Sequence, residues 1–322
     1  MPRYILRRLA LIPCVLLLAN FAGYAYAHLI RPLQLANNPL VALNREAAPL
    51  LPAYGAYLRD ALRLDLGAIP PAGAPVLQTV AAAAGASLGL LAVALLLSTI
   101  AGVALGLVAV RGDPPGIAAW LTAATTLGLA MPAFYIGSLA VLAVLSLLIY
   151  GSVIKPPPIQ GFGWDSHLIL PTLVLAARPT AQVAQVTASL LAAEMDKMYV
   201  TAARSVGVPL RMIRRRHALR NIIAPVATAV FTALRLMIGE LILVEWIFSW
   251  PGLGRQLALT LLAPESTAGP RVTFLHAPLL AATLTVLAAV FLVGDLLAGI
   301  AARVADPRLR AATEQAEDSA YA

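Results

Sequence analysis

The sequence predicts an all-α, polytopic membrane protein with about six transmembrane helices, and three observations lead to that fold class. Of the 322 residues, 60% are hydrophobic and only 12% are charged, about half the charged fraction of a typical soluble domain. The mean hydropathy of the chain is +0.84. Several apolar runs also reach the length of about 20 residues that a helix needs to cross a bilayer.

The net charge of the chain is +8, which would also suit a protein that binds nucleic acid. Membrane proteins collect arginine in their short cytoplasmic loops, however, and this bias alone makes such chains basic. We therefore predict a lipid membrane as the surroundings and no nucleic-acid partner. The single cysteine, Cys14, excludes an internal disulfide bond.

The first predicted transmembrane helix is residues 1–30, in which basic residues precede a long apolar run. The same features fit a secretory signal, for which Ala25-Tyr26-Ala27 offers a cleavage site of the small-x-small type. We favour an uncleaved helix because the rest of the chain is also apolar enough to lie in the membrane. Residues 31–76 are of mixed composition and predict an external loop with a short amphipathic helix.

Residues 77–310 are predicted to form the core of the molecule, with five further spans. The second span, residues 78–110, is dense in small residues and contains Gly85-x-x-x-Gly89 and Gly102-x-x-x-Gly106. This spacing lets helix backbones approach closely in lipid. We therefore expect another helix to pack against this span.

The third span, residues 117–150, is too long for one straight crossing, and Met131-Pro132 should kink it. Proline-rich residues 151–166 predict an external loop between the third span and the fourth. The remaining spans are predicted at residues 167–193, 222–248 and 277–302, and a polar cytoplasmic tail at 311–322 ends the chain.

The basic residues of the connecting loops predict how the spans are oriented. Residues 194–221 hold seven basic side chains, whereas the loop at 151–166 holds only Lys155. Because positively charged loops stay on the cytoplasmic side, we expect residues 194–221 and both chain termini in the cytoplasm.

Residues 194–221 contain a segment that is too short and too charged to cross a membrane. Asp196 suits the N-cap position of a helix and Gly207 the position after its end, so we predict a helix over 197–206. The small side chains of Ala202 and Ala203 would let its backbone lie in a groove of another protein. By these residues alone, an amphipathic helix on the anionic membrane surface is an equally good interpretation.

The sequence lacks the motifs of an enzyme. Neither Lys155 nor Lys197 follows a glycine, so there is no phosphate-binding P-loop, and any ATP-driven step would need another chain. The four histidines are scattered and the one cysteine cannot build a thiolate site. We predict no catalytic residue, no metal site and no cofactor in this chain.

The loop at 194–221 also carries a motif, which reads Tyr199–Gly207, then His217–Asn221 and Pro225. It resembles the EAA loop of binding-protein-dependent ABC importers, in the version of the dipeptide/oligopeptide/nickel permease family. Thr201 stands where the general motif has glutamate. Segments that match the same family in the same order are Arg3–Arg8, Asp65–Gly67, Met131–Phe134, Leu170-Pro171, Glu245–Arg255 and Asp306–Arg308.

The resemblance implies the architecture of a type I importer permease, which moves its solute by alternating access across the bacterial inner membrane. It implies three kinds of protein partner: a second homologous permease subunit, two cytoplasmic subunits that bind ATP and Mg²⁺, and an external solute-binding protein. The solute would be a peptide or a similar small polar molecule, with a nickel chelate or glutathione as further candidates. The residues that couple to the ATPase would be Tyr199, Thr201, Ala202, Ala203, Gly207, His217, Arg220 and Asn221.

Polar and charged side chains inside the fourth and fifth predicted spans form a second candidate site. An unpaired charge that faces lipid is costly, so these side chains should face the bundle or a water-filled path. They either form internal ion pairs that fix the helix packing, or they line the path of a charged or zwitterionic solute. The candidate pathway residues are Arg178, Gln182, Gln185, Arg235, Glu240 and Glu245.

The alternative function is a secondary transporter driven by an ion gradient, in which Glu240 or Glu245 would carry the proton. A purified secondary transporter would respond to a pH gradient by itself. An importer permease would transport nothing without its ATPase. A third interpretation, a structural scaffold in the membrane, predicts no transport defect on deletion.

Overall fold

The computed structural model describes residues 2–36, 49–70, 73–111, 115–151, 156–262 and 275–305. Lys155, the Asp306–Arg308 motif and the predicted tail at 311–322 lie outside these ranges. The described residues are mostly helical, as the all-α prediction requires. The long helices are α1 (Pro2–Ala36), α3 (Val76–Ala109), α5 (Ala133–Tyr150), α6 (Ile169–Met195), α9 (Leu219–Ile247) and α11 (Ala277–Ala305).

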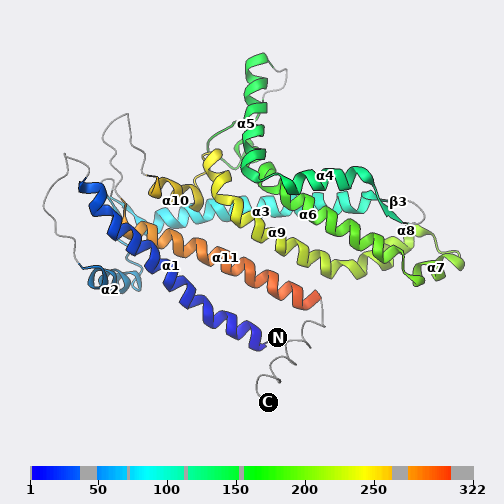
Figure 1. The fold of residues 1–322 in the computed structure, drawn as a ribbon, viewed down its shortest axis with the longest axis horizontal. Coiled ribbons are helices and arrows are strands. Elements are labelled where there is room, and N and C mark those ends of the chain that lie inside the picture. The colour runs from blue at the N-terminus through cyan, green and yellow to red at the C-terminus, as the bar shows by residue number, and fades with distance from the viewer. Residues whose placement is uncertain are drawn as a thin grey trace.

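Shorter elements lie at the two ends of the bundle and between its helices. Strands β1 (Ala68–Ile69) and β2 (Ala74–Pro75) pair antiparallel, as do β3 (Val110–Arg111) and β4 (Gly116–Ile117). Helices α2 and α10 lie at one end of the molecule, and α7, α8 and β3 lie at the other (Figure 1). The short helices are α2 (Leu50–Ala61), α4 (Ala119–Ala130), α7 (Met198–Ser205), α8 (Leu210–Ile213) and α10 (Leu253–Leu261), with a 3₁₀ turn at Ser166–Leu168 and a π-helical segment at Arg214–Ala218.

Five of the described helices are long and apolar enough to cross a membrane: α1, α3, α5, α9 with the residues before it, and α11. Helix α6, the fourth predicted span, is not among them although it has 27 residues. It lies in the middle of the bundle instead, where it packs against α3, α4, α5 and α9. A helix enclosed by protein can carry polar residues that lipid would not accept.

The third predicted span is divided rather than kinked. Helix α4 ends at Ala130 and α5 begins at Ala133, with extended backbone at Met131 and Pro132 between them. Proline cannot donate the backbone hydrogen bond that would continue α4. At about 1.5 Å per residue α4 is about 18 Å long, well short of a bilayer core of about 30 Å. Helix α5 packs against α6 and α9 at its beginning and then projects steeply from the bundle (Figure 1).

Helices α3 and α6 approach most closely at the second of the two glycine pairs. A Cβ atom added to Gly106 would lie 2.7 Å from the carbonyl oxygen of Ala184, and one added to Gly102 would lie 2.8 Å from the Cβ of Val183. Gly85, by contrast, has open space at its Cβ position. The prediction of close helix packing is therefore confirmed at Gly102 and Gly106, and not at Gly85.

Candidate functional site

The predicted coupling loop lies at the end of the bundle, where α7 follows α6 after two residues. Lys197, not Asp196, holds the N-cap position of α7, and it makes no side-chain capping bond. The prediction for Asp196 is wrong because α6 runs on to Met195 and Asp196 still has helical backbone angles. The extended residue that begins the new helix is therefore the next one along the chain.

The end of α7 explains why the motif has glycine at position 207. Gly207 has a backbone φ angle of +86°, which L-residues with a side chain rarely adopt. Its N–H donates to the carbonyl of Arg204 (2.9 Å), and the N–H of Val208 donates to the carbonyl of Ala203 (3.0 Å). These two bonds form a Schellman motif, which satisfies the last carbonyls of the helix and reverses the chain.

Glu194, in the last turn of α6, ties this loop to the bundle. Its carboxylate accepts hydrogen bonds from Lys197 Nζ (2.5 Å), Asn221 Nδ2 (2.8 Å) and Tyr199 Oη (3.1 Å). The residue is only 6% exposed. The three donors lie just before α7, in α9 and in α7, so one carboxylate connects α6 to both of the following helices.

Burial and the hydrogen bonds of this network shift the pKa values of Glu194 and Tyr199. Burial alone would raise the pKa of Glu194, but the hydrogen bonds from Lys197, Asn221 and Tyr199 lower it below its usual value. Burial and the hydrogen bond to this carboxylate raise the pKa of Tyr199 to about 12. The network therefore stays in its charged, hydrogen-bonded form at neutral pH.

Glu194 was not among the predicted coupling residues, because we considered the basic and small residues of the loop. The sequence did offer an indication of its role. An acidic residue at the end of a predicted span, followed by seven basic residues, is expected to pair with one of them. The structure gives Tyr199 and Asn221 a positioning role in this network. Tyr199 and Ala203 are half-buried, and the exposed predicted coupling residues are Thr201, Ala202, Gly207, His217, Arg220 and Asn221.

The basic segment after Pro209 continues directly into α9. Helix α8 passes into the π-helical segment Arg214–Ala218 and then into α9, which runs on through Pro225. Single π-helical turns inside helices are often found at functional sites. Ile213 and Ala218 are fully buried and fix this segment against the bundle, while Arg215, Arg216 and His217 are exposed.

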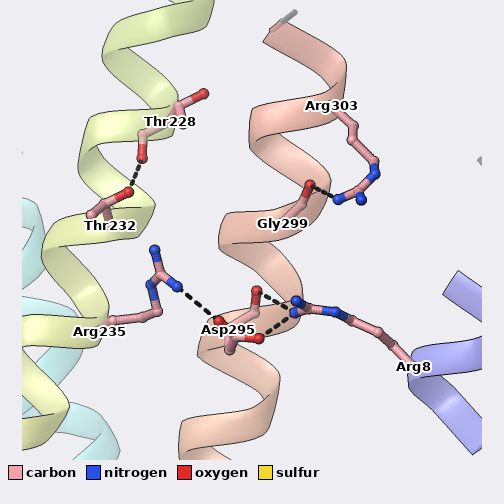
Figure 2. A network of polar contacts seen from close by, with 7 residues as sticks. All are labelled: Arg8, Thr228, Thr232, Arg235, Asp295, Gly299 and Arg303. Atoms are coloured by element: carbon pink, nitrogen blue, oxygen red, sulfur yellow. Dashed lines mark hydrogen bonds and ion pairs between the residues drawn. The ribbon is translucent and has the colours of Figure 1, made fainter. Parts of the chain in front are cut away.

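The charged side chains inside the bundle form ion pairs. Arg178 of α6 donates to Glu240 of α9 (Nη1 to Oε1, 2.8 Å), and Arg235 of α9 donates to Asp295 of α11 (Nη1 to Oδ1, 2.9 Å). Asp295 also pairs with Arg8 of α1, so that it lies between two arginines (Figure 2). Asp295 and Arg8 were not among the predicted residues of this site.

The pair of Arg178 and Glu240 is only partly satisfied among the described residues. Arg178 Nε, Glu240 Oε2 and Gln182 Oε1 are buried and have no hydrogen-bond partner there. Gln185, the other glutamine of the predicted stripe, is exposed. Arg178 Nε can donate a hydrogen bond to a ligand or to water, and Glu240 Oε2 and Gln182 Oε1 can each accept one. The geometry is therefore compatible with a solute path as well as with a structural pair.

Neutral substitutions separate these two roles of the pair. If the charges face the solute, Arg178→Gln and Glu240→Gln should each change the solute preference of uptake while the folded complex stays intact. If the pair is structural, each single change should lower the melting temperature, because it leaves one partly buried charge unpaired. The double variant should then recover stability, and that recovery would contradict the pathway role.

Glu245 has surroundings that differ from those of the other predicted pathway residues. It is fully buried, and Oε1 accepts from Ser87 Oγ (2.5 Å). Oε2 accepts from the backbone N–H groups of Gly254 (2.7 Å) and Arg255 (3.2 Å), in the first turn of α10. Both oxygens are therefore occupied inside the protein. This geometry gives no support to Glu245 as a lining residue of the path or as a proton carrier.

The Trp-Pro-Gly-Leu-Gly motif forms the turn around this carboxylate. Trp250 is fully buried and its indole N–H donates to the carbonyl of Ala86 in α3 (3.0 Å). A Cβ atom at Gly252 would collide with the Glu245 carboxylate, and one at Gly254 would lie 2.5 Å from Ile242 Cα. Only glycine leaves room for α10 to place its first N–H groups on the carboxylate.

Within the part of the chain that the structure describes, no group of three His, Cys, Asp or Glu side chains is arranged to hold a metal ion. The sites described above are accordingly made of hydrogen-bonded and ion-paired side chains.

Comparison with known proteins identifies the family. The family model for the inner membrane component of binding-protein-dependent transport systems matches residues 102–311, which include α6, the coupling loop and α9. The chain is 28% identical over 270 residues to a putative peptide transport system permease protein of Brucella abortus, covering 81% of each chain. It is 30% identical over 239 residues to a dipeptide transport system permease protein of Lactococcus lactis, covering 73% of this chain and 72% of the relative.

A glutathione transport system permease protein of Salmonella choleraesuis is 30% identical over 271 residues, which cover 80% of this chain and 86% of the relative. The matched region contains the buried Glu245 turn and the α3–α6 contact at Gly102 and Gly106 as well as the coupling loop. The chain therefore belongs to the ABC importer family of binding-protein-dependent inner membrane components and is a multi-pass transport permease, not an enzyme.

Proposed function

We propose that this chain forms half of the translocation path of an ATP-driven importer and receives the movement of a separate ATPase through α7. The observation that carries the proposal is the way α7 is held. Its outer surface is exposed, with Met198 83% and Val206 78% accessible. Its inner side is fixed by Val200, which is buried, and by the Glu194 network. Because α7 is held rigidly against α6 and α9, a movement of α7 would move these two helices as well.

The proposed partners are a second permease subunit, two cytoplasmic ATPase subunits that bind ATP and Mg²⁺, and an external solute-binding protein. An exposed patch of apolar and small side chains at α7 suits a protein partner better than water. The family description, which names binding-protein-dependent transport, supports the binding protein. The exposed apolar helix α5 provides lipid- or subunit-facing surface.

We place α7 and both termini on the cytoplasmic side. In support, the first residues of α1 and the last of α11 lie toward the end of the bundle where α7 lies (Figure 1). Reporter fusions after Pro158 and after Arg216 should then report opposite sides of the membrane. Fusions that report the same side would overturn this orientation.

The solute we propose is a peptide or a similar small polar molecule. The relatives are named for peptide, dipeptide and glutathione transport, and the partly unpaired Arg178–Glu240 pair offers both charges that a zwitterion needs. A comparison of the uptake of labelled dipeptides with the uptake of labelled glutathione by the assembled importer would test this assignment.

The coupling role predicts that enlarging α7 blocks transport without unfolding the chain. Gly207→Trp should reduce ATP-driven uptake more than tenfold in reconstituted vesicles, because a large side chain at this exposed position would hold the partner away. Its Cβ position meets no other atom within 4 Å, so the indole can fit within this chain itself. Ala203→Asp should act similarly, by placing a charge in the half-buried contact.

Gly207→Ala is the matched control, since it introduces the same backbone strain of about 1 kcal/mol at positive φ without the bulk. It should retain most of the uptake. Normal uptake by both Gly207→Trp and Ala203→Asp would show that α7 is only a surface helix.

A further inference from the structure

A cavity lies beside the coupling loop, with a volume of about 310 Å³. It opens where α3 and α6 end, between the β3–β4 hairpin on one side and α7 and α8 on the other. Its size lies at the lower end of the range for small-molecule sites. The lining residues are Val110, Arg111, Pro115, Met195, Val200, Arg204, Leu210, Arg211 and Arg214.

The walls of this cavity combine arginine with apolar side chains. Four of its nine lining residues are arginines, contributed by β3, α7, α8 and the π-helical segment, and none of the nine is acidic. Its floor is apolar and buried: Val110 is 6%, Met195 8% and Val200 3% exposed. Several positive charges around an apolar floor are the surroundings that a phosphate group attached to an apolar body requires.

We propose that this basic cavity binds the phosphate headgroup of an anionic phospholipid from the adjacent membrane leaflet. Guanidinium groups bind phosphate oxygens in a bidentate manner, and a cluster of them can hold one phosphate from several sides. The cavity lies beside the end of α3, which is long and apolar enough to cross a membrane, and the ends of such helices meet the headgroup region. Exposed Leu210 at its edge offers a contact for the glycerol and upper acyl chain.

The shared chemistry of the site is a phosphate anion, which could also come from a soluble molecule. The apolar floor and the position beside the ends of α3 and α6 favour the lipid. The proposal does not depend on the proposed ATPase, since it concerns the isolated chain in a membrane. A bound headgroup would join the β3–β4 hairpin to α7 and α8, and it would thereby stiffen the coupling loop from its other side.

The test compares two double variants of the full chain, purified in detergent. Arg211→Gln with Arg214→Gln removes two charges that line the cavity. Arg215→Gln with Arg216→Gln removes the same charge from the next two positions, which are exposed and outside the cavity. Native mass spectrometry would measure the affinity of each for phosphatidylglycerol and for phosphatidylcholine, with inorganic phosphate and glycerol 3-phosphate as soluble competitors.

We expect the cavity variant to bind phosphatidylglycerol about 25-fold more weakly than the unchanged chain, at about fivefold for each of the two arginines. The control variant should stay within about twofold. Displacement of the lipid by glycerol 3-phosphate at similar concentration would show that the phosphate alone is recognised. Resistance to that competitor would show that the apolar part is needed, and thus that the ligand is the lipid.

Equal weakening in both double variants would overturn the proposal, because the attraction would then be a general effect of charge. Equal affinity for phosphatidylglycerol and phosphatidylcholine would overturn it as well. If the cavity variant fails to fold, Arg111→Gln tests the site from the opposite wall, on strand β3. This single change should weaken phosphatidylglycerol binding about fivefold.

Discussion

Replacing Glu245 with alanine is expected to lower the stability of the chain by about 3 kcal/mol or more. The change removes the acceptor of three buried donors, the Ser87 hydroxyl and the N–H groups of Gly254 and Arg255. Each buried donor left without a partner costs about 1–3 kcal/mol. Helix α10 would also lose the acceptor that satisfies the free N–H groups of its first turn. Thermal unfolding of the purified chain in detergent would measure the loss.

Glu245→Gln is the informative control for this prediction. Its amide oxygen can still accept from Gly254 and Arg255, and its NH₂ group can donate to the Ser87 hydroxyl. We therefore expect a much smaller loss of stability than for alanine, with transport largely retained. Loss of transport in a stable Glu245→Gln chain would instead mean that the charge itself is used, and it would favour the proton-carrier interpretation.

The second large effect is expected for Gly106→Val. The new side chain would meet the carbonyl of Ala184 and the side chain of Thr187, at 2.7 Å already for its Cβ. The carbonyl is part of the helix backbone, so it cannot move aside alone, and α3 and α6 must separate. Overpacking of this kind typically costs about 1–3 kcal/mol, and the upper end applies where backbone is met. The measured outcome should be a lower melting temperature and a low yield of folded chain.

Gly85→Val serves as the matched control in the same helix. Its Cβ position has no atom within 4 Å, so valine there should leave the melting temperature nearly unchanged. A similar loss at both positions would show that valine disturbs α3 itself. That result would remove the argument that Gly106 is needed for the contact between α3 and α6.

Local rules predicted the features of this fold that depend on neighbouring residues. Gly207 was expected to end a short helix, because glycine adopts a positive φ without steric strain, and it does end α7. Met131-Pro132 was expected to kink the third span, and it divides the span into two helices instead. Asp196 failed as an N-cap because it is the C-cap of α6 and keeps helical backbone angles, whereas an N-cap residue has non-helical ones.

The choice of partners inside the bundle could not be predicted in the same way. Arg178 and Glu240 are 62 positions apart, and Arg8 and Asp295 are 287 positions apart. Which charged side chains form pairs depends on the rotation of whole helices and on their depth in the membrane. A short sequence motif determines neither of these. Counting the charges of two spans alone therefore missed Asp295. The same limit applies to Glu245, whose partners come from α3 and from the first turn of α10.

The polarity of α6 has a consequence for how the protein reaches the membrane. Arginine near the middle of a helix costs about 2.5–3.5 kcal/mol on insertion through the translocon, and α6 carries Arg178 with Gln182 and Gln185 close by. The partner that compensates Arg178 is Glu240 in α9, which the ribosome has not yet made when α6 emerges. In a nascent chain that ends just after α6, this helix should therefore not yet be stably inserted in the membrane. Helix α6 should become a stable part of the membrane protein only when α9 has been synthesised and packs beside it.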